Sequence, residues 1–406
     1  MLARVEVLCP AGGNLMCIAT LKATVPFDPQ VKTMVAAFSR RLAQDPAART
    51  FPEIVALAHW LRPRAILDLE NAFRAGLPKG TVAMGRGLAL HFAPGNVDTI
   101  FLYSAMLSVL AGNVTVVRVS SRASAQIALL TQVLSDVLAD PDIVEVAARI
   151  RIVRYPREDA ITAALSVACD LRVIWGGDTS VSEIRAFPLS PRARDLPFPD
   201  RWSLSVIDAE ALIAEDTDLP ALARAFANDA YWFGQMACSS PRLVLWHGKA
   251  DAAEEAASRF WPEVQRQAQR FAPAIQVVTY VDKLVAQCNA AIDGTTQNIR
   301  STGTNLISVA CLDRLQLPDT SLLHIGGGLF WEAHLPSLTE LKPLLNKRSQ
   351  TVSSFGMSGS LWSDWVQSEA AQIDRIVPMG QALLFDTVWD GQDLLRDLTR
   401  LIAIRC

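Results

Sequence analysis

The segment FGQMACSSPRLVLW contains the strongest candidate nucleophile of the chain, Cys238. Gly234 weakens the end of the preceding predicted helix and Pro241 begins the next predicted strand, so the thiol is expected on a short loop. Its small neighbours leave room for a substrate. Such a thiol attacks as the thiolate and needs no metal. The local sequence leaves open the default alternative, a buried cysteine that only packs.

Asn96 lies in HFAPGNVDT, after one predicted strand and before a predicted helix. Enzymes with parallel sheets place functional groups in loops at the carboxyl ends of strands. A side-chain amide there is suited to donating a hydrogen bond to a developing oxyanion. Position alone favours a plainer role as helix N-cap, which Asp98 would also fill.

Two more loops have residues suited to an anionic ligand. Gly176, Gly177 and Asp178 follow the predicted strand LRVIW. Glycines at this place let backbone N–H groups approach a phosphate at the start of a helix, although a bare pair of glycines is equally typical of a tight turn. The triple glycine before LFWEAH implies unusual dihedrals or a close backbone approach, as a ligand loop or as a turn between strands.

The second such loop ends the predicted strand VTVVRV and contains Arg118, Ser120, Ser121 and Arg122. Two guanidinium groups and two hydroxyls suit an anionic group. The alternative is a solvated helix N-terminus with a serine cap.

Short β-rich runs alternate with helical runs over most of the chain, which predicts an α/β fold with parallel sheets covered by helices. The charge-free run 99–117 is interrupted by Gly112 and Asn113, so we expect a buried helix, a turn and a buried strand and no membrane span. Farther along, the sequence predicts a strand at 276–280 and a helix near 338–345, and 190–202, rich in proline and charge, is interpreted as a crossover.

Composition excludes several classes of protein. Half of the 406 residues are apolar, 19% are charged and the net charge is −3, so no basic excess drives binding to nucleic acid. A mean hydropathy of +0.22 favours buried parallel strands or a homo-oligomer interface. Seven scattered cysteines without a CxxC pattern predict reduced thiols in the cytoplasm and no metal site.

The segments APGNV, LAGNVTVVRVSS, VIWGG, ACSSP, GGGLFWEAH and VPMGQALLFDTVWDG occur in this order and together resemble the aldehyde dehydrogenase superfamily. The similarity is greatest to its acyl-CoA reductases, which include the long-chain acyl reductase component of the bacterial luminescence fatty-acid reductase complex. It extends from about Val25 to the end of the chain. It implies a mainly helical segment at 1–75, an NAD(P)-binding domain at 76–208, a catalytic domain with the nucleophile at 209–380 and a C-terminal tail at 381–406.

The resemblance also implies roles for individual residues. Cys238 matches the thiol that a thioester acylates, and Asn96 matches the amide that forms the oxyanion site with the backbone N–H of that cysteine. Arg118 occupies the place where a lysine commonly contacts the adenosine ribose. Gly176–Asp178 falls on the glycine loop near the cofactor phosphates.

Three departures separate the chain from aldehyde-oxidising relatives. The stretch Leu196–Ser203 lacks the glutamate that activates water, and His324–Gly328 replaces a Glu-x-Phe-Gly-Pro segment that holds the nicotinamide ribose. Ser121 replaces an acidic residue that would pair with the 2′-hydroxyl of NAD, while Arg118 and Arg122 beside it suit a 2′-phosphate. NADPH is therefore the expected cofactor, with NADH as the alternative.

These features together predict the reduction of an acyl thioester to an aldehyde through a cysteine acyl-enzyme. The acyl group would come from coenzyme A, an acyl carrier protein or a partner acyl ligase. The alternatives are NAD-dependent aldehyde oxidation and a non-catalytic scaffold for a ligase or carrier protein, because a fold does not by itself define a function.

Overall fold

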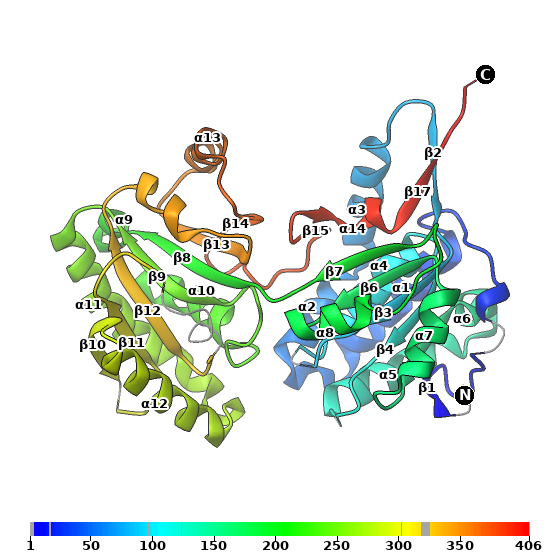
Figure 1. Cartoon of the computed structure of the whole chain (residues 1–406), viewed down its shortest axis with the longest axis horizontal. Helices are drawn as coiled ribbons and strands as arrows, with labels where there is room; N and C mark the ends of the chain where they lie inside the picture. The colour runs from blue at the N-terminus through cyan, green and yellow to red at the C-terminus, as the bar shows by residue number, and fades with distance from the viewer. Residues whose placement is uncertain are drawn as a thin grey trace. The chain divides into compact units, whose positions relative to one another are not determined.

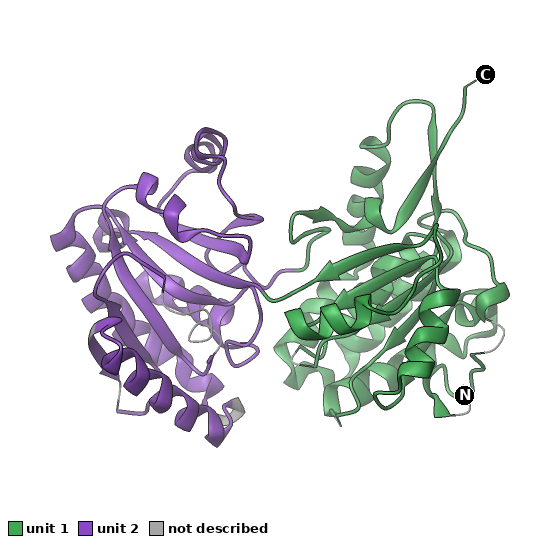
Figure 2. Ribbon diagram, viewed as in Figure 1, with its two compact units in different colours: residues 1–200, 385–406 green, residues 201–384 purple. Residues whose placement is uncertain are grey.

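The computed structural model describes residues 4–15, 18–95, 97–122, 124–301, 303–317 and 325–405. The chain forms two compact units, one of residues 1–200 and 385–406 and the other of residues 201–384 (Figure 2). Each unit has its own mainly parallel sheet with helices packed on it (Figure 1). The sequence placed 202–208 at the end of the first domain, whereas this strand hydrogen-bonds to strands of the second unit. From residue 385 the expected tail returns to the first unit.

The first unit is built on a six-stranded sheet in the order β1-β5-β4-β3-β6-β7. Only β1 is antiparallel, to β5. After β3 the chain adds β4 and β5 on one side of it and then β6 and β7 on the other. The strand order therefore reverses between β3 and β6, and the carboxyl ends of these two strands border a topological switch point, where α/β proteins bind ligands. The strands are β1 (Glu6–Cys9), β3 (Leu88–Phe92), β4 (Val114–Arg118), β5 (Ile150–Arg154), β6 (Leu171–Trp175) and β7 (Arg194–Phe198).

Helices cover this sheet, and α4 (Ile100–Leu110) is buried at every position. The charge-free run is thus a core helix followed by β4, as the sequence predicts. Among the described residues, no helix combines the length and apolarity that crossing a membrane requires. The other helices of the unit are α1 (Pro29–Gln44), α2 (Pro52–Trp60), α3 (Pro63–Ala75), α5 (Ala125–Leu138), α6 (Val144–Ala148), α7 (Asp159–Ala168), α8 (Asp178–Arg185) and α14 (Leu394–Asp397).

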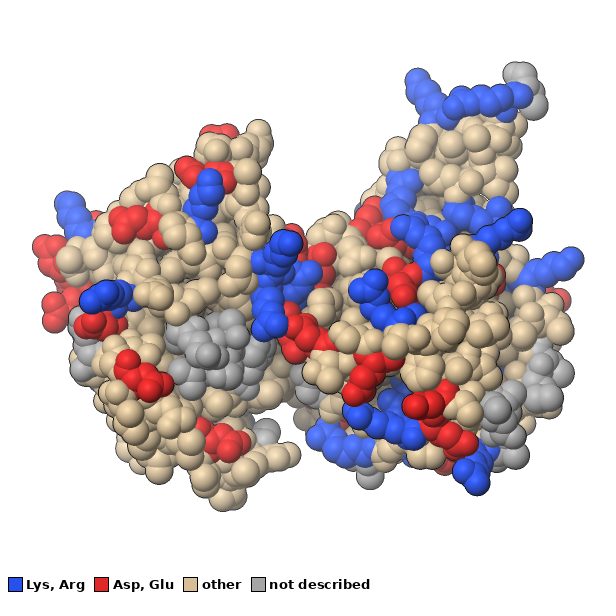
Figure 3. Space-filling view, viewed as in Figure 1, with Lys and Arg blue, Asp and Glu red and all other residues tan. Residues whose placement is uncertain are grey.

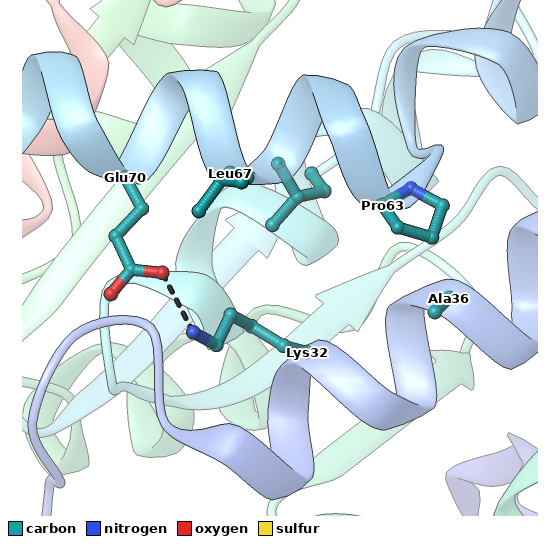
Figure 4. A pocket seen from close by; sticks show the side chains of 6 residues that line it. Lys32, Ala36, Pro63, Leu67 and Glu70 are labelled. Atoms are coloured by element: carbon teal, nitrogen blue, oxygen red, sulfur yellow. Dashed lines mark hydrogen bonds and ion pairs between the residues drawn. The ribbon is translucent and has the colours of Figure 1, made fainter.

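A small cavity of about 180 Å³ lies between α1 and α3 (Figure 4). Lys32 Nζ donates to Glu70 Oε2 across it at 2.7 Å. Burial raises the pKa of Glu70, but the hydrogen bonds from Lys32 and Arg74 outweigh it and lower the pKa overall. This cavity holds a paired, structural carboxylate and no candidate nucleophile.

Two strands far apart in sequence, β2 (Thr81–Gly85) and β17 (Thr399–Ala403), pair antiparallel and extend away from the six-stranded sheet (Figure 1). On the face drawn in Figure 3, Lys and Arg side chains gather near this ribbon. Arg86 Nε donates to the carbonyl of Asp397, and Arg194 lies 3.7 Å from the carboxylate of the same residue. The C-terminal segment is therefore fastened to the first unit by charge as well as by strand pairing.

The second unit has a seven-stranded sheet in the order β10-β11-β12-β9-β8-β13-β14, in which only β10 is antiparallel to its neighbour. Because β8, β9, β12 and β13 run in parallel, their amino ends meet at one edge of the sheet. The strands are β8 (Trp202–Asp208), β9 (Pro241–His247), β10 (Thr296–Ser301), β11 (Ser308–Leu312), β12 (Leu329–Leu335), β13 (Ser349–Phe355) and β14 (Arg375–Pro378).

An aromatic cluster packs the helices of this unit onto its sheet. Phe226 of α10 contacts Phe260 and Trp261 of α11 and Phe330 of β12, with ring centroids 5.2–5.8 Å apart. Edge-on and tilted contacts of this kind add to the free energy of apolar burial. The helices are α9 (Ala209–Ile213), α10 (Leu219–Tyr231), α11 (Ala250–Ala268), α12 (Val277–Ile292) and α13 (Gly359–Glu369).

Two expectations for local structure are wrong. Residues 276–280, predicted as a strand, form the start of α12. The prediction failed because periodicity alone does not distinguish a strand from a helix in a short apolar, β-branched run. The predicted helix near 338–345 consists of two short 3₁₀ turns separated at Leu341, the second containing Pro343. The stretch 190–202, interpreted as a crossover, contains the boundary between the two units and also a strand that was not predicted, β7.

Candidate active site

The structure places Cys238 on the loop between α10 and β9, where the sequence predicts it. Gly234 and Gln235 have positive φ angles of 59° and 67°, which turn the chain away from the helix axis. Pro241 is the first residue of β9. The thiol is half-buried, so it remains partly accessible to a reagent.

A fully buried glutamine holds this loop in place. Gln235 Nε2 donates to the carbonyls of Pro241 and Leu329, both at 3.0 Å, and Gln235 Oε1 accepts the N–H of Gly328 at 2.8 Å. One side chain thus satisfies three backbone groups and fastens the cysteine loop to the starts of β9 and β12.

Arg242 supports the same loop from the sheet. Its side chain is 2% exposed, and its Nη2 donates to the carbonyls of Gln235 and Ala237 at 3.0 and 3.2 Å. These carbonyls flank the turn that leads into Cys238. The loop is therefore fixed by side chains that are themselves buried, as a preorganised site requires.

The triple glycine packs directly on this loop. The N–H of Gly327 donates to the carbonyl of Gly234 at 2.9 Å. A Cβ on Gly326 would lie 2.7 Å from Met236 Sδ and 2.8 Å from the Gly234 carbonyl oxygen, closer than such atoms approach in proteins. The sequence left open why three glycines occur here, and the structure explains Gly326 by this close approach.

A buried lysine braces the glycine segment from α12. Lys283 Nζ donates to the carbonyls of Asn305 and Gly327 at 2.7 and 3.0 Å. Burial lowers the pKa of Lys283 to about 8. The ammonium group thus joins the glycine segment to the turn that precedes β11.

The starts of β8 and β13 provide the polar contacts of the cysteine itself. Gln350 Nε2 lies 3.1 Å from Cys238 Sγ. Ser203 Oγ donates to the carbonyl of Cys238 at 2.7 Å and accepts the N–H of Thr351 at 3.1 Å. The strand order of the sheet brings these residues together from positions up to 148 apart in sequence.

Three other described cysteines have environments that disfavour the thiolate. Burial raises the pKa of Cys9 to about 11 and that of Cys169 to about 12. Burial and the carboxylate of Glu332 raise the pKa of Cys311 to about 12. Among the residues that the structure describes, no group of three His, Cys, Asp or Glu side chains could hold a metal ion.

In the first unit, the predicted cofactor loop lies at the carboxyl ends of β4 and β5. The guanidinium of Arg118 lies over the ring of Tyr155, 5.3 Å from its centroid, and both Arg118 Nη2 and Ser121 Oγ donate to the Tyr155 carbonyl. Ser120 Oγ accepts the N–H of Arg122, and Arg122 lies 3.9 Å from Asp98. The structure thus brings the four predicted residues into one turn.

The turn at Gly176, Gly177 and Asp178 follows β6 at the switch point. Its geometry is fixed by a reciprocal pair of hydrogen bonds, because the N–H of Asp178 donates to Asp200 Oδ2 at 3.0 Å and the N–H of Asp200 donates to Asp178 Oδ1 at 3.1 Å. Two carboxylates therefore lie at the start of α8, where they oppose a phosphate. Asn96 and His324 lie outside the described residues.

Solved structures of aldehyde dehydrogenases are similar to the whole chain. The chain aligns with an NAD-dependent aldehyde dehydrogenase from Sinorhizobium meliloti at 12% identity and a TM-score of 0.67, covering 97% of this chain and 84% of that one. An NAD-dependent benzaldehyde dehydrogenase from Corynebacterium glutamicum gives 14% identity and a TM-score of 0.63, with 94% and 86% covered. The fold is thus of the aldehyde dehydrogenase type, as the sequence predicts.

The family model for acyl-CoA reductase (LuxC) matches residues 34–284, more than half of the chain. The protein belongs to this family. A long-chain acyl-protein thioester reductase from Aliivibrio fischeri is 26% identical over 202 residues, which are 48% of this chain and 39% of that protein. The chain therefore aligns with well under half the length of that relative.

Sequence reasoning missed the residues that hold the cysteine, namely Gln235, Arg242, Ser203 and Gln350. Gln235 and Arg242 lie within four residues of the thiol, and their polar side chains beside a predicted buried strand were an available signal. Gln350 gave no such signal, because its strand is rich in polar residues and was not predicted.

Proposed function

We propose that this protein reduces an acyl thioester to an aldehyde through an acyl-enzyme on Cys238, with NADPH as the reductant. The observation that carries the proposal is the cysteine loop itself. A half-buried thiol has an amide donor 3.1 Å from its sulfur, and its loop is held by buried side chains on three strands, Ser203 of β8, Arg242 of β9 and Gln350 of β13. Such rigid support is typical of a reacting group.

In the first step the Cys238 thiolate attacks the thioester carbonyl. A new C–S bond forms, the bond to the donor sulfur breaks, and the donor leaves as a thiolate of coenzyme A or of a carrier protein. Membership of the acyl-CoA reductase family supports this substrate class. We propose Asn96 as the side-chain donor to the oxyanion, together with the backbone N–H of Cys238.

The turn of Arg118, Ser120, Ser121 and Arg122 is where we place the adenosine ribose and its 2′-phosphate. Arg118 Nε is buried and has no hydrogen-bond partner among the described residues, so this turn retains an unused donor. NADPH, when bound, supplies a hydride to the acyl-enzyme. Gly176 and Gly177 provide backbone near the switch point, while the main chain and carboxylate of Asp178 anchor the turn to Asp200.

Intact-mass analysis after incubation with acyl-CoA tests the proposal. We expect one acyl adduct that hydroxylamine removes, and no adduct on Cys238→Ala. Asn96→Ala is expected to lower turnover by roughly a hundredfold or more, the usual loss for one oxyanion donor. An adduct that persists on Cys238→Ala would refute the nucleophile, and normal turnover of Asn96→Ala would refute the donor.

A further inference from the structure

We propose that Gln350 is a further catalytic residue, whose side-chain amide donates a hydrogen bond to the thiolate of Cys238 and so keeps the nucleophile charged and aimed. This inference rests on the proposed function, in which that thiolate attacks a thioester. It adds a group from a part of the chain that no motif of the sequence singled out.

The geometry of the contact carries the proposal. Gln350 Nε2 lies 3.1 Å from Cys238 Sγ, within the distance at which an N–H donates to sulfur. A carboxamide nitrogen can only donate, so the sulfur must be the acceptor. A thiolate accepts such a bond far better than a thiol, because hydrogen bonds to charged groups are the stronger ones.

The position of Gln350 makes its amide a fixed donor. Gln350 is 2% exposed and belongs to β13, where its backbone carbonyl accepts the N–H of Asp374 at 3.2 Å. The Thr351 hydroxyl lies 3.4 Å from Gln350 Oε1, and hydrogen bonding there orients Nε2 towards the sulfur. A buried amide that turns its nitrogen to a half-buried thiol has a chemical role as well as a packing role.

No proton transfer is involved in this role. The amide stabilises the negative charge on Cys238 Sγ before attack. Once the sulfur carries the acyl group it is neutral, and the hydrogen bond from the amide N–H to the sulfur is lost. A glutamine suits this task because it stays neutral at every working pH, whereas a basic residue would change charge.

The pH dependence of Cys238 alkylation by iodoacetamide tests the proposal, with the site of modification identified by peptide mass spectrometry. In the protein without substitutions we expect the reacting thiol to titrate below about 8.5, the ordinary pKa of cysteine. Gln350→Leu should raise the pKa of this thiol by about one to two pH units, because a hydrogen bond to a charged group is lost. Gln350→Glu, which keeps the shape, should raise it further.

Gln367→Leu is the matched control, because this exposed glutamine of α13 donates its side-chain hydrogen bond to Ser363 of the same helix. It should leave the alkylation profile unchanged. An unshifted profile in a folded Gln350→Leu or Gln350→Glu variant would overturn the proposal. A Cys238 thiol that titrates at or above about 8.5 in the protein without substitutions would also overturn it, and this measurement does not depend on the folding of any variant.

Acyl transfer is measured separately, so the two proposals fail in different ways. If Cys238 forms no acyl adduct but the alkylation profile shifts as expected, the thioester function is wrong and the amide–thiolate contact stands. If the adduct forms and the profile does not depend on residue 350, the function stands and Gln350 has no catalytic role.

Discussion

Replacing Gln235 by alanine should disrupt the second unit more than any other single change on the cysteine loop. The side chain is fully buried and bonds to the carbonyls of Pro241 and Leu329 and to the N–H of Gly328. Alanine removes all three bonds at once. It also leaves a residue with φ near 67° without the contacts that hold it there.

The size of the effect follows from the groups left unpaired. Each buried backbone group without a partner costs about 1–3 kcal/mol, so three of them set a loss of at least about 3 kcal/mol. The left-handed conformation costs glutamine and alanine alike about 1–2 kcal/mol, whereas glycine adopts it without this cost. Gln235→Gly should therefore be less destabilised than Gln235→Ala by about 1 kcal/mol, although it loses the same hydrogen bonds.

Urea unfolding followed by tryptophan fluorescence measures these differences, with the rate of Cys238 alkylation as a local readout. Gln367→Ala, on an exposed glutamine, should change the free energy of unfolding by less than about 0.5 kcal/mol. A loss of under about 1 kcal/mol for Gln235→Ala, or equal losses for the alanine and glycine variants, would refute this explanation of the loop.

Three further predictions concern the glycine segment, a buried acid and the cofactor turn. Gly326→Ala should slow Cys238 alkylation more than Gly294→Ala, because both residues have positive φ but only Gly326 meets Met236 and the Gly234 carbonyl. Burial raises the pKa of Asp229 to about 7, so the folded protein binds the extra proton between about pH 4 and 7 and the free energy of unfolding should fall as the pH rises through this window. Asp229→Asn should flatten that dependence in urea titrations. Ser121→Glu should shift the ratio of kcat/KM values from NADPH towards NADH.

Each of these has a clear contrary result. Equal alkylation rates for the two glycine variants would show that the close approach of Gly326 does not matter. A pH profile of stability that Asp229→Asn leaves unchanged would place the extra proton elsewhere. A cofactor ratio that does not respond to Ser121→Glu would show that the turn after β4 does not select the cofactor.

The sequence was informative where local chemistry decides the structure. Apolar runs such as 88–92 and 114–118 predict buried parallel strands, and Gly234 with Pro241 places Cys238 on its loop. The motifs in order also led to the fold and the family. These signals lie within a few residues of the features that they predict.

The rest depends on contacts that no local pattern encodes. Gln350 reaches Cys238 across 112 residues of sequence, and their meeting follows from the order β9-β8-β13 in the sheet. Six of the seven residues of β13 are buried, yet the strand is rich in Ser, Thr and Gln, so hydrophobic periodicity could not reveal it. The valines at the start of α12 mislead in the opposite direction, since an apolar β-branched run predicts a strand but lies on an exposed helix surface.

The central claim is that the acyl group on Cys238 is the species that becomes aldehyde. The most direct test is a single turnover in which the acyl-enzyme is formed with acyl-CoA, freed of excess thioester and then mixed with NADPH. The account predicts that the adduct disappears from the intact mass while one equivalent of aldehyde and one of NADP⁺ form. An adduct that persists while NADPH is present, or that is released as the carboxylic acid, would contradict it.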